Sequence, residues 1–227
     1  MIRSRRLRSL VALLAVFLPG PLRRFVHTRL LGYRLHPTAS IGHALIDVDV
    51  LEMGQGARIG HLVILRGCEE VRLGDWSIIQ MLVWINSVRA DKGYFRDVER
   101  RPALIMGHKA LITMLHFIDA CDLVELEDFA SLAGFGSLVQ THAVDLKSLK
   151  QDCAPVRISE SSLVASRSTL LPGAIVPSCS IVAAGSVVNG KLVGHQLFGG
   201  VPARPLRETD LTWGYFNRPR DGAPGAW

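Results

Sequence analysis

The sequence predicts an all-β solenoid in which each short strand and its turn form one repeat of six residues. Aliphatic residues recur at every sixth position over one long stretch: Ile158, Val164, Leu170, Val176, Val182 and Val188. A period of six fits neither an α-helix nor an isolated strand, whose periods are 3.6 and 2. Small residues often stand four positions after the aliphatic ones, as at Ser162, Ser168 and Ala174. A β-sandwich would not hold one phase over six repeats, so the solenoid is the better prediction.

The same period recurs upstream in shorter runs that are shifted against one another. The first run starts at Met53, the second at Leu73 and the third at Met106, and a fourth comprises Leu126, Leu132 and Leu138. Glycine often follows the aliphatic residue in these runs, and we expect a positive φ at those glycines. Together, the runs predict one continuous solenoid over residues 35–207.

Residues 1–34 form a separate basic and apolar segment. The segment carries eight arginines and no acidic residue, and an apolar run of nine residues from Leu10 to Leu18 precedes Pro19-Gly20-Pro21. Nine apolar residues are too few to span a bilayer. We expect a short helical segment that lies as a basic amphipathic hairpin on an anionic membrane surface. A helix docked on the protein itself and a secretory signal stay open, although no small-residue cleavage site follows.

Two interruptions of the repeat and a tail complete the chain. The repeat breaks at residues 88–104 and at residues 143–154, and we expect both segments to be excursion loops. The second loop follows His142 directly, so it is placed to wall a pocket beside that residue. Residues 208–227 form an irregular tail, and its aromatic residues predict packing on the solenoid or on a neighbouring subunit.

Five short words stand in order along the solenoid, at residues 141–146 (THAVDL), 154–158 (APVRI), 171–173 (LPG), 183–188 (AAGSVV) and 199–205 (GGVPARP). With these words the chain resembles the hexapeptide-repeat acyltransferases, most closely the O-acetyltransferases of cell-surface polysaccharide biosynthesis. The resemblance covers about residues 35–207. It implies a left-handed parallel β-helix, although the general preference for right-handed crossovers would predict the opposite hand. It also implies a homotrimer whose active sites lie between protomers.

His142 is the candidate catalytic base. Transfer of an acyl group from a thioester to a sugar hydroxyl needs a base for the hydroxyl proton, and imidazole titrates near neutral pH. The resemblance implies this role for the histidine of the first word. Asp145, three residues later, is a candidate to orient the ring, and a simple turn aspartate is the equal alternative. Asp119 has a weaker claim to either role.

His116 is a candidate contact for the acyl acceptor. It stands four positions after Ile112, where small residues prevail, so its bulk needs a special reason. A structural histidine is the alternative. Counted in repeat units, His116 and His142 fall on different faces of a three-sided coil, so we expect them to converge only across a subunit boundary.

The resemblance implies acetyl-CoA as the acyl donor, with its pantetheine arm extended along a coil edge made of small residues. Ala165, Ala184 and Gly185 are the candidates for this edge. Arg204 and Arg207 are the candidate partners of the nucleotide phosphates, because guanidinium binds phosphate bidentately. Arg207 could instead cap the end of the solenoid.

The function predicted from the sequence is transfer of an acetyl group from acetyl-CoA to a hydroxyl of a sugar, polysaccharide precursor or lipid-linked glycan. N-acyl transfer to an amino-sugar nucleotide and a non-catalytic β-helix assembly protein stay open. A zinc carbonic anhydrase on such a fold would need a pair of histidines five residues apart, and none of the eight histidines is so placed. We therefore expect no metal.

The net charge and the cysteine content indicate which classes of partner and which cellular compartment to expect. The net charge of +6 comes without an aromatic-basic motif, so it fits anionic substrates or a membrane surface rather than nucleic acid. The four cysteines form no CxxC pair, which favours reduced thiols. Because coenzyme A is cytosolic, we expect a cytoplasmic protein that is peripheral at the cytoplasmic membrane face.

Overall fold

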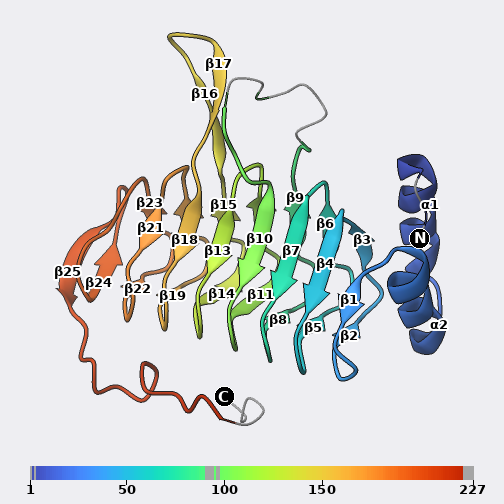
Figure 1. Ribbon diagram of the computed structural model, residues 1–227. Helices are drawn as coiled ribbons and strands as arrows, with labels where there is room; N and C mark the ends of the chain where they lie inside the picture. The colour runs from blue at the N-terminus through green and yellow to red at the C-terminus, as the bar shows by residue number, and fades with distance from the viewer. Residues whose placement is uncertain (1, 3, 90–94, 96–97, 222–227) are drawn as a thin grey trace.

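The computed structural model describes residues 2, 4–89, 95 and 98–221. Residues 90–94 and 96–97 of the first predicted excursion and residues 222–227 of the tail lie outside the described residues. The chain forms the predicted left-handed parallel β-helix, with helices at its N-terminal end and the tail along one side (Figure 1). The fold class is therefore confirmed.

Three sheets form the walls of the solenoid, and the chain passes from the first to the second to the third in each coil. The first sheet contains β1 (Arg34–Leu35), β4 (Val50–Met53), β7 (Glu70–Leu73), β10 (Ala103–Met106), β13 (Val124–Leu126), β18 (Val156–Ile158) and β21 (Ile175–Val176). The second contains β2 (Ser40–Ile41), β5 (Arg58–Ile59), β8 (Ile78–Ile79), β11 (Leu111–Met114), β14 (Ser131–Phe135), β19 (Leu163–Val164), β22 (Ile181–Val182), β24 (Gln196–Gly199) and β25 (Arg204–Glu208). The third contains β3 (Leu45–Asp47), β6 (Ile64–Arg66), β9 (Trp84–Asn86), β12 (Phe117–Asp119), β15 (Leu138–Val139), β20 (Thr169–Leu170) and β23 (Val187–Val188). Strand neighbours within these sheets are parallel except for the antiparallel pair β24 and β25.

The six-residue period arises from the stacking of equivalent positions in successive coils. Every aliphatic residue of the series from Ile158 to Val188 is fully buried. Complete burial of such a side chain contributes about 1.5–3 kcal/mol, so the series forms a continuous hydrophobic core. The small residues four positions later, including Ser162, Ser168 and Ala174, are also fully buried at the corners. Both sequence regularities are confirmed.

The glycines that follow the aliphatic residues are required for a reason other than the expected positive φ. Gly60, Gly74 and Gly107 do not have a positive φ. A Cβ on Gly74 would instead lie 2.7 Å from the backbone carbonyl carbon of Gly107 in the next coil. The left-handed residue of the turn comes later and is often not glycine, as at Leu62 and Ser161. Close approach of the coils, rather than φ, selects glycine there.

One coil departs from strict six-residue spacing. Leu138 was expected to point inward, but Val139 is the fully buried residue and Leu138 is only half-buried. The corner between Leu132 and Val139 therefore contains one extra residue, and the pairing of β11 with β14 shifts register at this corner.

The N-terminal segment packs on the first coil. It contains α1 (Arg5–Ala15), α2 (Gly20–Phe25) and the π-helical η1 (Val26–Leu30). Ala12 and Ala15 are buried, and α1 packs against β3. Arg8 donates hydrogen bonds to the carbonyl oxygens of Leu31 and Val48 at 2.9 and 3.3 Å. No helix in the described part of the chain is long and apolar enough to cross a membrane.

The second predicted excursion is an ordered hairpin, and the tail returns along the solenoid (Figure 1). The hairpin pairs β16 (His142–Asp145) with β17 (Lys150–Cys153). In the described part of the tail, the carbonyl oxygen of Pro219 accepts a 2.8 Å hydrogen bond from Lys109 Nζ, and Arg218 donates to the carbonyl oxygen of Phe129. The tail thus packs on its own solenoid.

Candidate active site

Two excursions leave the solenoid at the corner between the third and first sheets. Residues 87–102 connect β9 to β10, and the β16–β17 hairpin lies between β15 and β18, so both connections leave the solenoid at the same corner. The hairpin projects from this corner (Figure 1). Asp119 ends β12, the strand between β9 and β15 in the third sheet, and His142 begins the hairpin. This corner therefore brings together Asp119 and His142 at the base of the hairpin.

His142 and Asp119 form a hydrogen-bonded pair at this corner. His142 Nδ1 lies 2.6 Å from Asp119 Oδ2, and the two side chains are 38% and 18% exposed. Because an ionised carboxylate only accepts, the bond assigns the ring proton to Nδ1. The Nε2 lone pair is then available to accept a proton, and within the described residues no hydrogen bond occupies it. This is the arrangement that a general base requires.

The carboxylate of Asp119 is held by backbone donors as well as by the histidine. The amides of Thr141 and His142 donate to Oδ2 at 3.0 and 3.2 Å, and the amide of Cys121 donates to Oδ1 at 3.1 Å. Burial alone would raise the pKa of Asp119, but the hydrogen bonds outweigh it and lower that pKa below its ordinary value. The group is thus a carboxylate at neutral pH and stabilises a protonated imidazole beside it.

Aromatic and cationic side chains of the first excursion lie beside this pair. The Phe95 ring meets the His142 ring edge-on, with centroids 5.7 Å apart. The Arg100 guanidinium lies 4.6 Å from the Phe95 centroid and donates to the carbonyl oxygens of Val88 and Cys121. The Phe95 ring thus covers one side of the histidine ring.

Asp145 does not orient the histidine. It lies at the far end of β16, and its Oδ1 accepts hydrogen bonds from the amides of Lys147 and Ser148 at 2.8 and 3.3 Å. Its side chain therefore closes the hairpin turn, as an aspartate two residues before a turn amide commonly does. The predicted role passes to Asp119, and the turn alternative holds for Asp145.

His116 is a structural residue rather than an acceptor contact. It is completely buried, Nδ1 accepts from the Ser137 amide at 3.1 Å, and Nε2 lies 2.9 Å from Thr113 Oγ1. Burial lowers the pKa of His116 to about 4, so the ring is neutral at physiological pH. His116 precedes β12 and His142 follows β15, so the two histidines lie at opposite edges of the third sheet and do not meet within one chain.

The candidate donor residues lie along another edge, the corner between the second and third sheets. Ala165 follows β19, and Ala184 and Gly185 follow β22 in the next coil. The coils stack directly here, since the Gly185 amide donates to the Ser166 carbonyl oxygen at 2.9 Å. Ala184 and Gly185 are exposed, so this edge is open to an extended ligand. Within one chain it is separated from His142 by the width of the third sheet.

The two candidate phosphate-binding arginines have different surroundings. Arg204 is exposed, and its neighbour Ala203 donates a 2.7 Å hydrogen bond to the Val187 carbonyl oxygen, which places Arg204 near the donor edge. Arg207 lies with its guanidinium 5.8 Å from the centre of the Trp213 ring. Arg207 thus packs on the tail, in line with the capping alternative.

Asp119, Cys121 and His142 bring potential metal-binding atoms within 4.8 Å of one another. Burial, and then the hydrogen bond to Asp119, raise the pKa of Cys121 to about 12, so its sulfur is a neutral thiol at physiological pH. Metal ligation requires the thiolate. The Asp119 oxygens are already bound by amides, so the cluster fits an acid–base pair better than a metal site.

Asp119, rather than Asp145, is the carboxylate that contacts His142. It lies far upstream of His142, but Ile118 pairs with Val139, so the chain beyond Val139 crosses directly over Asp119. An alignment of the run that contains Ile118 with the run that contains Leu138 would place Asp119 close to His142. The extra residue before Val139 shifts that alignment by one position, which obscures the contact in the sequence.

The sequence matches no protein-family model, and no curated protein matches it. Among solved structures, the polysialic acid O-acetyltransferase OatWY is 14% identical over 78% of this chain and 84% of that chain, with a TM-score of 0.57. A hexapeptide-repeat acetyltransferase from Vibrio cholerae O1 biovar eltor, solved with acetyl-CoA, is 17% identical over 90% of this chain and 86% of that chain, with a TM-score of 0.49. AntD, an N-acyltransferase from Bacillus cereus solved with dTDP and coenzyme A, is 14% identical over 81% of this chain and 88% of that chain, with a TM-score of 0.40. The structural neighbours thus include hexapeptide-repeat acetyltransferases, and the likeness to OatWY establishes a shared fold.

Proposed function

We propose that the protein transfers an acetyl group from acetyl-CoA to a hydroxyl of a sugar or glycan precursor. The observation that carries the proposal is the His142–Asp119 pair, in which an ionised carboxylate holds Nδ1 and leaves Nε2 as a base. The fold shared with the polysialic acid O-acetyltransferase OatWY supports a glycan hydroxyl as acceptor.

The proposed reaction is one direct transfer. His142 Nε2 takes the proton of the acceptor hydroxyl while its oxygen attacks the thioester carbonyl. Asp119 stabilises the imidazolium that forms, by charge and through its bond to Nδ1. The tetrahedral intermediate then breaks its carbon–sulfur bond, and the coenzyme A thiolate leaves with the proton that Nε2 returns. The products are the acetyl ester and free coenzyme A.

The first test is release of free thiol from acetyl-CoA, with a panel of sugars and glycan precursors read by mass shift. His142→Ala should lower turnover by about two to four decades, the usual range for a positioned base, with little change in coenzyme A binding. Retention of most of the activity by this variant would exclude His142 as the base. Acetylation of amino sugars alone would replace hydroxyl transfer by N-acyl transfer, and no release with any acceptor would favour a non-catalytic assembly role.

We also propose that the active protein is a homotrimer with its site between protomers. The donor edge and His142 lie at different corners of one chain, so a second copy is needed to bring them together. The outer face of the third sheet supports such an interface, because Trp84 and Phe117 are 50% and 54% exposed with ring centroids 6.3 Å apart. Exposed aromatic residues of this kind favour burial against a partner.

Complementation distinguishes a shared site from a site within one chain. His142→Ala removes the base, and Ala184→Trp blocks the exposed donor edge. If each site combines a base from one protomer with an edge from the next, every mixed cyclic trimer contains one intact site. Co-expression in equal amounts should then restore about one quarter of the wild-type activity, although each variant alone is inactive. No restoration, or a monomer at micromolar concentration, would overturn the shared site.

For localisation, we propose that the N-terminal helices hold the protein at the cytoplasmic face of a membrane. The outer side of α1 and the turn after it are apolar, with Leu14 and Phe17 56% and 77% exposed, and Arg6 and Arg29 are exposed on the same N-terminal segment. Arg8 is hydrogen-bonded to the body of the protein and Arg34 pairs with Glu52, so fewer than the eight arginines are available to a membrane. Each available basic residue contributes about 1 kcal/mol near an anionic leaflet.

Vesicle co-sedimentation tests this localisation. Binding to anionic vesicles should weaken as salt is raised. Leu14→Asp should reduce it strongly, whereas Leu146→Asp, at an apolar position 84% exposed on the distant hairpin, should not. Equal losses for both variants, or cleavage of residues 1–34 in the mature protein, would contradict the membrane contact.

A further inference from the structure

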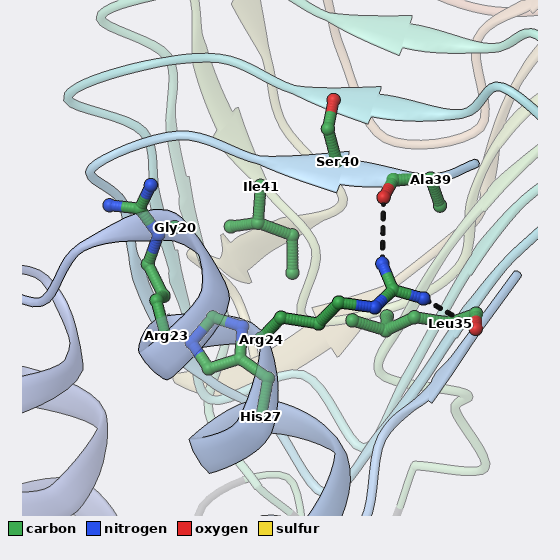
Figure 2. Close-up of a pocket in the computed structure, with 8 residues that line it drawn as sticks. All are labelled: Gly20, Arg23, Arg24, His27, Leu35, Ala39, Ser40 and Ile41. Atoms are coloured by element: carbon green, nitrogen blue, oxygen red, sulfur yellow. Dashed lines mark hydrogen bonds between the residues drawn. The ribbon is translucent and has the colours of Figure 1, made fainter. Parts of the chain in front are cut away.

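A pocket lies between the N-terminal helices and the first coil of the solenoid. Its volume is about 200 Å³. Arg23, Arg24 and His27 come from α2 and η1, and Ser40 and Ile41 from β2 on the opposite wall (Figure 2). The proposed acyl transfer uses none of these residues, because the pocket lies at the opposite end of the solenoid from the donor edge.

Two side chains that line this pocket are buried without partners. Arg23 is 7% exposed and His27 is completely buried. Within the described residues, Arg23 Nη1 and both ring nitrogens of His27 lack a hydrogen-bond partner. Buried polar groups are almost always hydrogen-bonded, and a buried charge without a partner is strongly unfavourable. A ligand that supplies acceptors would remove this cost.

The charges around the pocket specify the sign of that ligand. Arg24 donates to the carbonyl oxygens of Ala39 and His36, both at 2.9 Å, which fixes a second guanidinium at the wall without neutralising it (Figure 2 shows the bond to Ala39). Among the described residues that line the pocket, none is acidic. Two fixed positive charges without a carboxylate favour an anion.

The donors around the pocket favour phosphate over a simpler anion. Burial, and then the charge of Arg23, lower the pKa of His27 to about 4, so at neutral pH its ring is uncharged and offers one N–H donor. A phosphate group has several oxygens in a tetrahedral arrangement, so it can accept from a guanidinium and from a second donor at once.

We propose that this pocket binds a phosphate group through Arg23, with His27 as a further donor. The phosphate can belong to a free phosphorylated compound or to the headgroup of an anionic phospholipid, since both present the same chemistry. The proposal is independent of acyl transfer, and its test does not use that activity.

Thermal unfolding of the full chain in inorganic phosphate, against sodium chloride of equal ionic strength, tests the site. At about 100 times the dissociation constant, phosphate should raise the wild-type Tm by roughly 5–10 °C. Arg23→Met keeps most of the buried stem but removes the charge, so it should be at least as stable without phosphate and gain only about 1 °C with it. Arg29→Met, at an exposed position of the same segment, should respond like the wild type.

The thermal unfolding results test the proposal, and vesicle binding identifies the source of the phosphate. No phosphate-specific rise in the wild type, or an equal rise in Arg23→Met, overturns it. Should Arg23→Met fail to fold, Arg23→Lys replaces it, because lysine keeps the charge but lacks the bidentate guanidinium. Undiminished phosphate protection in Arg23→Lys then overturns the proposal. Weaker binding of Arg23→Met than of Arg29→Met to phosphatidic acid vesicles identifies a lipid headgroup. Equal vesicle binding together with phosphate protection identifies a free phosphorylated compound.

Discussion

Replacing Asp119 with asparagine tests the central pair with almost no change of shape. The carboxylate accepts from His142 Nδ1 at 2.6 Å and from three backbone amides, and its pKa is lowered by these bonds. Asparagine is neutral and has a single acceptor oxygen, so it cannot serve all of these donors or balance an imidazolium. A hydrogen bond to a charged group contributes about 1.5–3 kcal/mol. At 1.36 kcal/mol per decade, turnover should fall roughly 10- to 150-fold.

The assay is steady-state thiol release at saturating acetyl-CoA, with circular dichroism to show that the variant is folded. Asp145→Asn is the matched control, because Asp145 bonds only hairpin amides and should leave turnover unchanged. A folded Asp119→Asn protein within about threefold of the wild type would refute the orienting role of Asp119. Equal losses in both variants would point to a requirement for the hairpin instead.

Three further outcomes follow from the same geometry. The lowered pKa of Asp119 means that its carboxylate stabilises the folded state at pH values above 3.8, the ordinary value. The stability advantage of the wild type over Asp119→Asn, measured by urea unfolding, should therefore shrink as the pH falls below 3.8. His116→Ala should lose about 1–3 kcal/mol of stability at pH 7, and the KM for the acceptor should not change. Because the pKa of His116 is about 4 in the folded protein and 6.5 ordinarily, the wild type should lose stability as the pH falls from 6.5 to 4, and the His116→Ala variant should lose less. Arg204→Ala should weaken binding of coenzyme A more than binding of a donor without the nucleotide, and equal calorimetric losses would place Arg204 in terminal packing.

The hydrophobic core could be predicted because it depends on spacing alone. In a stacked coil each position lies above its equivalent, so an aliphatic residue in every sixth place is enough to specify an inward side chain. The series from Ile158 to Val188 contains no insertion, and each member is buried as expected. Prediction failed at Leu138, where the local pattern allows two neighbouring aliphatic residues and only the register of the adjacent coil selects Val139.

The candidate site was less predictable because it depends on register between distant strands. The nearest acidic residue in sequence, Asp145, was a reasonable partner for His142, but two residues three apart on a strand point to opposite faces. Asp119 reaches the ring because parallel stacking places the end of β12 under the start of the hairpin. His116 is the converse case: a histidine at a corner position that usually holds a small side chain suggests a function, but Ser137 and Thr113 satisfy its two ring nitrogens.

The extra residue in the corner between Leu132 and Val139 links these two observations. His116 is larger than the residues at the equivalent corners, such as Val83 and Ser168, and the longer turn above it supplies the Ser137 amide that binds its Nδ1. The turn also determines which residues follow β15, because Val139 rather than Leu138 pairs with Ile118, and the chain then crosses Asp119 as Thr141 and His142. We infer that the buried histidine and the His142–Asp119 pair are coupled through one lengthened turn. Removing one residue from that turn should therefore disturb the His142–Asp119 bond even though neither partner is altered.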